Sequence, residues 1–393
     1  MHQFENENGD FMRLLETVKD QAAMSQDFLV PTNQIQVRTT VPATYRQSQA
    51  YKGEDNERVT QIIIEQHGGE PTHISTLNTV AFEQLANKSK LDIATARRLQ
   101  DHYPEIFDSY MNAYATQEPA KRMLRTHSEA TGRGGQYDGY SIGRAWTSDS
   151  YKTFDHLDLL DAALPTLRDS DLQHKVISAV ITERRLYLRT KCLAVTGEAQ
   201  VGDTMALGVC LSNSEVALGS VSVREILWTL ACLNGMQTQK FSRQAHLTSA
   251  RGDDELMKVL SAEAVDADNQ AMKFKTRDLV AHIGSRESFE KSLEKMRAAN
   301  EDTIEGSNVG AVEALGTVLK LSKKDTSKVL EGLFATMGQA GYVGKSVSKG
   351  ALVNAVTACA HDAHPDRVDE WQQLGGKLLD LPRSEWSRVA LAA

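Results

Sequence analysis

The sequence predicts an α+β protein with a central antiparallel sheet (strand-strand-strand-helix core) flanked by helices, and with a helical C-terminal region. Three stretches support this prediction: an apolar segment at 201–211, alternating segments before it, and helically spaced residues after 251. Between residues 204 and 211, large apolar residues stand at odd positions and small residues at even positions. This pattern is typical of a strand that is buried on both faces.

Two shorter strands are expected before this segment. Ile177, Ala179 and Ile181 mark the first, and the tight link 182–184 suggests a hairpin into the second. In the second strand, one face is apolar, whereas the other carries a tyrosine between cations. The residues of that basic face are Arg185, Tyr187, Arg189 and Lys191.

A helix is expected after the buried strand. Residues 222–225 have the sequence of a capping box, and Ile226, Leu227 and Leu230 follow at helical spacing up to Asn234-Gly235. The predicted local order is therefore strand, strand, strand, helix.

The rest of the chain divides by composition into four regions. Residues 1–57 are expected to form an N-terminal arm. It begins with a short helix at 11–24, and the rest is expected to be extended or partly disordered. Residues 58–117 are expected to form a mixed, mostly helical region with a short strand at 62–64. Residues 118–250 form the α+β core, which begins with a loop-rich stretch around Gly132–Gly135, and 251–393 is the helical region. Helices are expected at 154–167, 350–363 and 365–379, with the last one closed by Gly375-Gly376.

Composition bounds the class of protein. The chain has 393 residues, of which 41% are apolar, so it can bury a large core. It has no apolar run of the roughly 18 residues that a membrane helix needs, and its first residues are polar and acidic. Four cysteines without CxxC spacing predict reduced thiols in a cytoplasmic protein. We expect no cofactor and no metal.

The charge is uneven along the chain. The net charge of −8 argues against indiscriminate nucleic-acid binding. Residues 175–251, however, hold nine basic against five acidic residues. Since salt screens charges beyond about 8 Å, a local cationic face could still bind phosphate.

Several stretches together resemble the phage/plasmid-like protein family, whose members are encoded by phages and plasmids and contain a domain of unknown function. They run in family order across residues 82–389: Arg144–Tyr151, Leu159–Leu167, Val201–Asp203, Leu211–Val216, Cys232–Met236, Leu352–Ala358 and Leu374–Leu378. The resemblance implies a mobile-element protein of a bacterial host, and the family has no settled biochemical role. More distantly, the strand-strand-strand-helix order resembles the core of Rad-type single-strand annealing proteins, which implies recombination or replication by a homo-oligomeric ring or filament.

These observations lead to a functional hypothesis: binding and annealing of single-stranded DNA without an enzymatic step. Cations would follow the backbone while a ring stacks on a base. The alternative is a solvated sheet face with no ligand. The candidate nucleic-acid-binding residues are Arg125, Arg133, Arg144, Trp146, Arg185, Tyr187, Arg189, Lys191, Lys240 and Arg243.

Other interpretations stay open. Residues 338–346 resemble a phosphate-binding loop, which would suit a nucleotide-dependent enzyme, but the required glycine is replaced by Gln339, which favours a helix linker. Cys359, His361 and His364 could bind a metal or simply end a helix. The acidic helices after residue 253 could bind a host protein. Asp203, Asn213 and Glu215 are expected to form turns rather than an active site.

Overall fold

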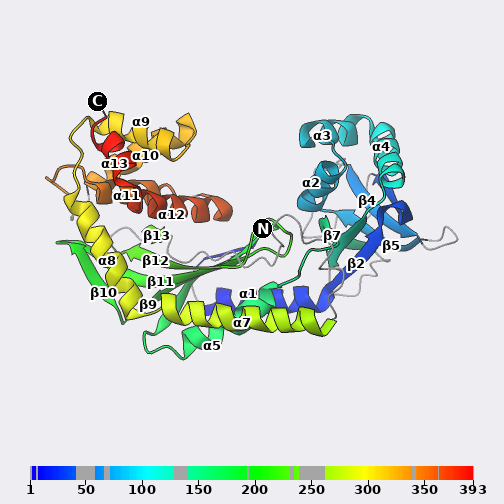
Figure 1. Ribbon diagram of the computed structural model, residues 1–393, viewed down its shortest axis with the longest axis horizontal. Helices are drawn as coiled ribbons and strands as arrows, with labels where there is room; N and C mark the ends of the chain where they lie inside the picture. The colour runs from blue at the N-terminus through cyan, green and yellow to red at the C-terminus, as the bar shows by residue number, and fades with distance from the viewer. Residues whose placement is uncertain are drawn as a thin grey trace.

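The computed structural model describes residues 2–5, 8–40, 58–65, 71–127, 140–192, 194–230, 234–238, 262–338, 342–361 and 363–392. The described chain forms two β-sheets with helices packed against them, and the molecule is elongated, with one sheet toward each end (Figure 1). The predicted α+β class is confirmed.

The first sheet is antiparallel and has seven strands among the described residues. Its order is β1-β8-β9-β11-β12-β13, and β10 pairs with β11. The strands are β1 (His2–Glu5), β8 (His174–Ile181), β9 (Leu186–Cys192), β10 (Thr196–Gln200), β11 (Asp203–Asn213), β12 (Ser222–Thr229) and β13 (Asn234–Gln237). The predicted β8–β9 hairpin and the strand β11, which is buried on both faces, are confirmed.

The prediction of a helix after β11 is wrong, because residues 222–229 form the strand β12. It pairs along its whole length with β11, and all eight of its residues are buried. Val223 and Leu227 belong to the two large hydrophobic cores that pack against this sheet. Ile226 and Trp228 belong to a smaller, separate cluster with Ala206 of β11. The apolar residues that fit a helical period also fit two-sided burial in a strand, and pairing with β11 decides between the two.

Helices cover both faces of this sheet (Figure 1). Leu14, Leu159 and Val280 belong to the core of one face, and Phe289 and Trp371 belong to the core of the other. The first face is covered by α1 (Asn8–Met24), α5 (His156–Arg168) and α7 (Ala262–Ile283). On or beyond the second lie α8 (Arg286–Glu301), α9 (Asn308–Val318), α10 (Lys323–Met337), α11 (Lys349–Ala358), α12 (Pro365–Leu379) and α13 (Arg383–Ala390). The helical C-terminal region is thus confirmed.

Gly375 and Gly376 do not end α12, which continues to Leu379. A Cβ atom at Gly376 would overlap the backbone carbonyl of Gln237 in β13. Gly376 therefore allows close contact between α12 and β13, and Gly375 allows close contact between α12 and Thr357 of α11. Both have a packing role rather than the predicted role as a helix stop.

The second sheet has six strands in the order β2-β6-β7-β5-β4-β3, of which β5 and β7 are parallel. Its core contains Ile62, Phe82, Phe107, Leu124 and Trp146. The strands are β2 (Ser25–Pro31), β3 (Ile35–Thr40), β4 (Val59–Glu65), β5 (Pro71–Leu77), β6 (Lys121–His127) and β7 (Tyr140–Ser148). The short 3-10 helix η1 (Thr32–Gln34) joins β2 to β3, and α2 (Thr79–Lys88), α3 (Ile93–His102) and α4 (Pro104–Gln117) cover one face.

This sheet changes two expectations. The described part of the arm supplies two strands to this sheet, at residues 25–31 and 35–40. The stretch 118–150 is not loop-rich where it is described, because 121–127 and 140–148 pair as strands. The glycine-rich segment 132–135 lies outside the described residues.

Candidate functional site

The basic face of β9 is covered by α12. Tyr187 and Arg189 are buried; the Tyr187 hydroxyl donates to Asp366 at 2.8 Å, and Arg189 Nε donates to Gln372 at 3.0 Å. The carboxylate of Asp369 lies 3.8 Å from the Arg189 guanidinium. The predicted alternation of faces is correct, but the predicted exposure of these two residues is wrong, because a helix from the C-terminal region packs on them and supplies the counter-charges.

The other two residues of that face are half-buried. Arg185 donates a hydrogen bond to the carbonyl of Leu218. Lys191 is in the last part of β9, on the same face as Arg189. An extended cationic track along β9 is therefore absent from the surface of the described chain.

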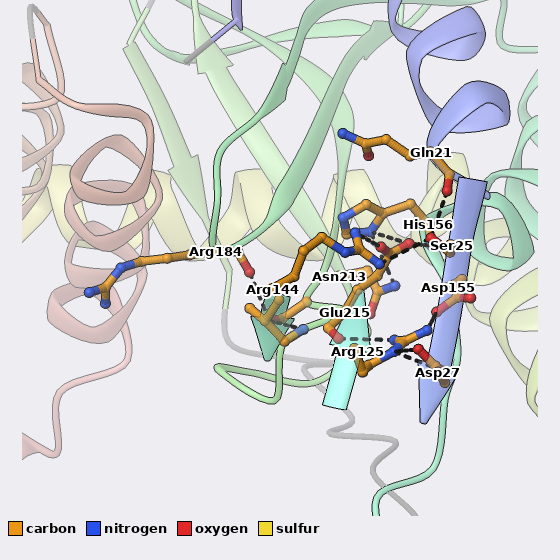
Figure 2. A network of polar contacts seen from close by, with 12 residues as sticks. Gln21, Ser25, Asp27, Arg125, Arg144, Asp155, His156, Arg184, Asn213 and Glu215 are labelled. Carbon is orange, nitrogen blue, oxygen red and sulfur yellow. Dashed lines mark hydrogen bonds and ion pairs between the residues drawn. The ribbon is translucent and has the colours of Figure 1, made fainter. Parts of the chain in front are cut away.

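A second buried network contains Arg125 and Arg144, at the junction of the two sheets (Figure 2). Arg125 is 1% exposed and donates to Asp27 at 3.0 Å, to Asp155 at 2.9 Å and to the carbonyl of Glu215 at 2.9 Å. Arg144 donates to the carboxylate of Glu215 at 2.7 Å. Carboxylates neutralise both arginines, so the expectation that they contact nucleic acid at the surface is wrong.

Glu215 lies in the turn that follows β11, as expected, and its carboxylate is also the centre of this network. Its carboxylate also accepts the backbone N–H of His156 at 2.6 Å, while Asn213 donates to the carbonyl of Phe154 at 2.8 Å. Burial opposes ionisation of Glu215, but His156 and Arg144 outweigh it and lower the pKa of the carboxyl. The network therefore fastens the end of β11 to β6, β7 and the start of α5.

Asp203, another expected turn residue, is buried at the start of β11. It accepts a hydrogen bond of 2.9 Å from the Tyr342 hydroxyl, and burial raises its pKa. Because its partner comes from the segment before α11, Asp203 links the sheet to the helical region.

A cavity of about 240 Å³ lies between the six-stranded sheet and the helices α2 and α4. Its walls are mostly apolar, and Trp146, a predicted site residue, forms part of them. Trp146 is fixed there because its backbone N–H donates to Gln84 of α2 at 2.8 Å. The cavity is lined by Thr32, Ile35, Val37, Leu85, Lys88, Ser89, Met111, Tyr114, Ala115, Glu118, Pro119, Ala120, Arg122 and Trp146.

Two cations of this cavity, Lys88 and Arg122, are half-buried. Within the described part of the chain, neither has a carboxylate at ion-pair distance. Burial and, after it, the charge of Arg122 lower the pKa of Lys88. The two like charges repel each other beside an apolar wall, and no described residue supplies a counter-ion. An anion would stabilise this arrangement.

Glu118, the acidic residue of the lining, is already bound. Its carboxylate accepts hydrogen bonds from Tyr114 and from Lys90, each at 2.9 Å. These contacts keep Glu118 with Lys90 at the exposed rim.

Hydrogen bonds between distant parts of the sequence and a turn after α2 shape the cavity. The Thr32 hydroxyl donates to the carbonyl of Ala115 and accepts the N–H of Ala120, both at 3.0 Å, which holds η1 against the end of α4. The helix α2 ends at Lys88, and Lys90 turns the chain with a positive φ of 57°. The side chains of Lys88 and Arg122 thus come from a helix end and from the start of a strand, which share no sequence motif.

The remaining sequence-based interpretations concern three basic residues, the segment 338–346, a possible metal site and the acidic helices. Arg133, Lys240 and Arg243 lie outside the described residues. The segment near 338–346 follows the helix α10 and not a strand, and Lys345 donates to Gln200 at 2.7 Å, so it does not have the setting of a phosphate-binding loop. Among the described residues, no group of three His, Cys, Asp or Glu side chains could hold a metal ion. The use of the acidic helices as a partner surface stays a prediction.

Comparisons of the chain with protein-family models, curated proteins and solved structures gave no match. The resemblance to the phage/plasmid-like family therefore stays a prediction. In the described part of the chain, none of the helices has the length and apolar character to cross a membrane.

Proposed function

We propose that the protein binds a small organic anion in the cavity beneath α2 and α4. One observation carries this proposal: Lys88 and Arg122 meet at an apolar cavity without a carboxylate partner among the described residues. The ligand would place a phosphate or carboxylate between the two cations and an apolar body against Leu85, Met111 and Trp146. Concave, mostly apolar sites with a few convergent polar groups are the usual form of small-ligand sites.

The chemistry of the two cations fits an anion better than a neutral ligand. The guanidinium of Arg122 can donate to two oxygens at once, and Lys88 adds a point charge. An incoming anion would also remove the repulsion between them. We do not propose annealing of single-stranded DNA through the face of β9. Tyr187 and Arg189 lie beneath α12, where a DNA strand could not contact them.

Isothermal titration calorimetry with phenyl phosphate and benzoate tests this proposal, with phenol as the uncharged control. We expect the two anions to bind and phenol not to bind. Lys88→Met and Arg122→Met should each weaken binding about tenfold to a hundredfold, since a charged hydrogen bond contributes roughly 1.5–3 kcal/mol. Arg98→Met, at an exposed arginine of α3, is the matched control and should bind like the wild type. Equal binding by all three variants would refute the site.

A further inference from the structure

A row of exposed side chains on α4 leads toward the cavity. Tyr103, Ile106 and Tyr110 are 50%, 59% and 38% exposed. They occupy positions three and four residues apart, and so lie on one face of the helix together with Tyr114. Tyr114 belongs to the cavity lining, so the row ends at the cavity. A row of large exposed apolar and aromatic side chains is uncommon on a surface without a partner.

The ring of Tyr110 is held close to the cations. It stacks on Tyr114 with ring centroids 6.3 Å apart. Its hydroxyl donates to the carbonyl of Ser89 at 2.8 Å, and Ser89 directly follows Lys88. One exposed aromatic ring is therefore fixed beside Ser89 of the cavity lining, next to two cations that have no carboxylate partner among the described residues.

The size of the cavity limits what it can enclose. At about 240 Å³ it is smaller than the roughly 300–1,000 Å³ of pockets that bury drug-sized ligands. A ligand with an anionic group inside would therefore extend outward, and the exposed ring of Tyr110 is hydrogen-bonded to Ser89 of the lining.

We propose that the ligand is a nucleotide, whose phosphate lies between Lys88 and Arg122 and whose base stacks on Tyr110. This proposal rests on the proposed function, because it needs the cavity to bind an anion. Stacking of a base on an aromatic side chain contributes without selecting the base, since every base has a flat face. The nucleotide could be free or could be the end of a single strand, and both sources present the same phosphate and base.

The acidic groups near this surface do not oppose the proposal. Glu118 is neutralised by Lys90. Asp101 and Glu105 lie at the other end of the row, and at 1.5 Å per residue Glu105 is about 14 Å along the helix from Tyr114. Asp108 of the same helix accepts hydrogen bonds from the backbone N–H and the hydroxyl of Thr39, at 2.9 and 2.8 Å. The carboxylates of α4 are therefore either hydrogen-bonded within the protein or at the far end of the row.

Calorimetry with adenosine 5′-monophosphate, adenosine and inorganic phosphate tests the proposal. We expect the nucleotide to bind at least tenfold more tightly than phosphate, and adenosine to bind weakly. Tyr110→Leu should lower nucleotide affinity severalfold and leave phosphate affinity unchanged. Tyr110→Phe keeps the ring but loses the hydrogen bond to Ser89, so it should lower nucleotide affinity less than Tyr110→Leu does. Tyr103→Leu, at the far end of the same row, is the matched control.

The outcomes separate the two proposals. If phosphate and phenyl phosphate bind but the nucleotide binds no more tightly than phosphate, or if Tyr110→Leu changes nothing, the nucleotide proposal is wrong and the anion site stands. If no anion binds, the proposed function itself fails. Oligonucleotides with and without a terminal phosphate, single-stranded and blunt duplex, then distinguish the sources. Binding that requires the terminal phosphate on a single strand identifies a strand end, and binding of the mononucleotide alone identifies a free nucleotide.

Discussion

At the scale of single residues, the arginines of this protein fall into two kinds. Arg125, Arg144 and Arg189 are buried and paired with carboxylates, and their charges stabilise the contacts between elements. Arg122 is half-buried at a cavity and has no such partner among the described residues. Charge alone does not separate these kinds, because the difference lies in what packs around each side chain.

Glu215→Gln should destabilise the protein strongly. The substitution leaves the buried Arg144 without a full counter-charge, and breaking a buried ion pair by removing one partner costs about 3–5 kcal/mol. Urea unfolding monitored by circular dichroism measures the loss. Glu290→Gln, at an exposed position of α8, is the control and should leave the unfolding midpoint unchanged. Equal midpoints for both variants would contradict the role assigned to the junction network.

The sequence shows where the cations are but not where their partners are. Tyr187 and Arg189 alternate with Leu186 and Leu188, as predicted. Their carboxylate partners, Asp366 and Asp369, lie far away in the sequence, and Asp366 comes 179 positions after Tyr187. Nothing in the local pattern distinguishes a basic face that is solvated from one that a distant helix covers. The cavity was missed for the same reason, since it forms only when α4 packs on the second sheet.

At the scale of elements, strands whose apolar residues alternate along the sequence could be predicted, whereas strands without this alternation could not. The strand β11 repeats large and small residues, and its two-sided burial follows. The strand β6, KRMLRTH, buries Leu124 on one face and a paired arginine on the other, so its sequence has no apolar alternation and resembles a loop. The strand β12 fits both periods, and only its pairing partner decides.

Gly376→Ala in α12 tests the contact between this helix and β13. In a free helix the change would stabilise by about 1 kcal/mol. Here the added methyl group would overlap the carbonyl of Gln237, and overpacking costs about 1–3 kcal/mol, so we expect a net loss of stability. Gly338→Ala is the control, because a Cβ atom there comes no closer than 3.4 Å to its neighbours. Thermal unfolding of the two variants compares them, and a stabilised Gly376→Ala variant would show that α12 can move away from the strand.

At the scale of the whole molecule, the junction network holds the two sheets together through partners from five elements or their adjoining loops. Asp27 and Arg125 belong to the second sheet, whereas Asn213, at the end of β11, and His156, at the start of α5, belong to the first sheet and its helical layer (Figure 2). Two histidines lie in or beside this network. Burial lowers the pKa of His156, and burial together with the charge of Arg144 lowers the pKa of His127 to about 4.

These histidines predict how stability depends on pH. A histidine whose pKa is lower in the folded protein binds its proton more weakly there, so the unfolded chain takes up protons first as the pH falls below about 6.5. Stability is therefore complete above that pH and declines toward pH 4, by about 1.4 kcal/mol per pH unit for His127 alone. Urea unfolding at pH 7.0, 6.0 and 5.0 measures the slope, in a range where most carboxylates stay ionised. His127→Gln should flatten it, and His102→Gln, at an exposed position of α3, should not. The comparison uses the slope of the unfolding free energy against pH, so a loss of stability that is the same at each pH would not affect the result. An unchanged slope in His127→Gln would mean that the pH dependence comes from the protonation of other groups.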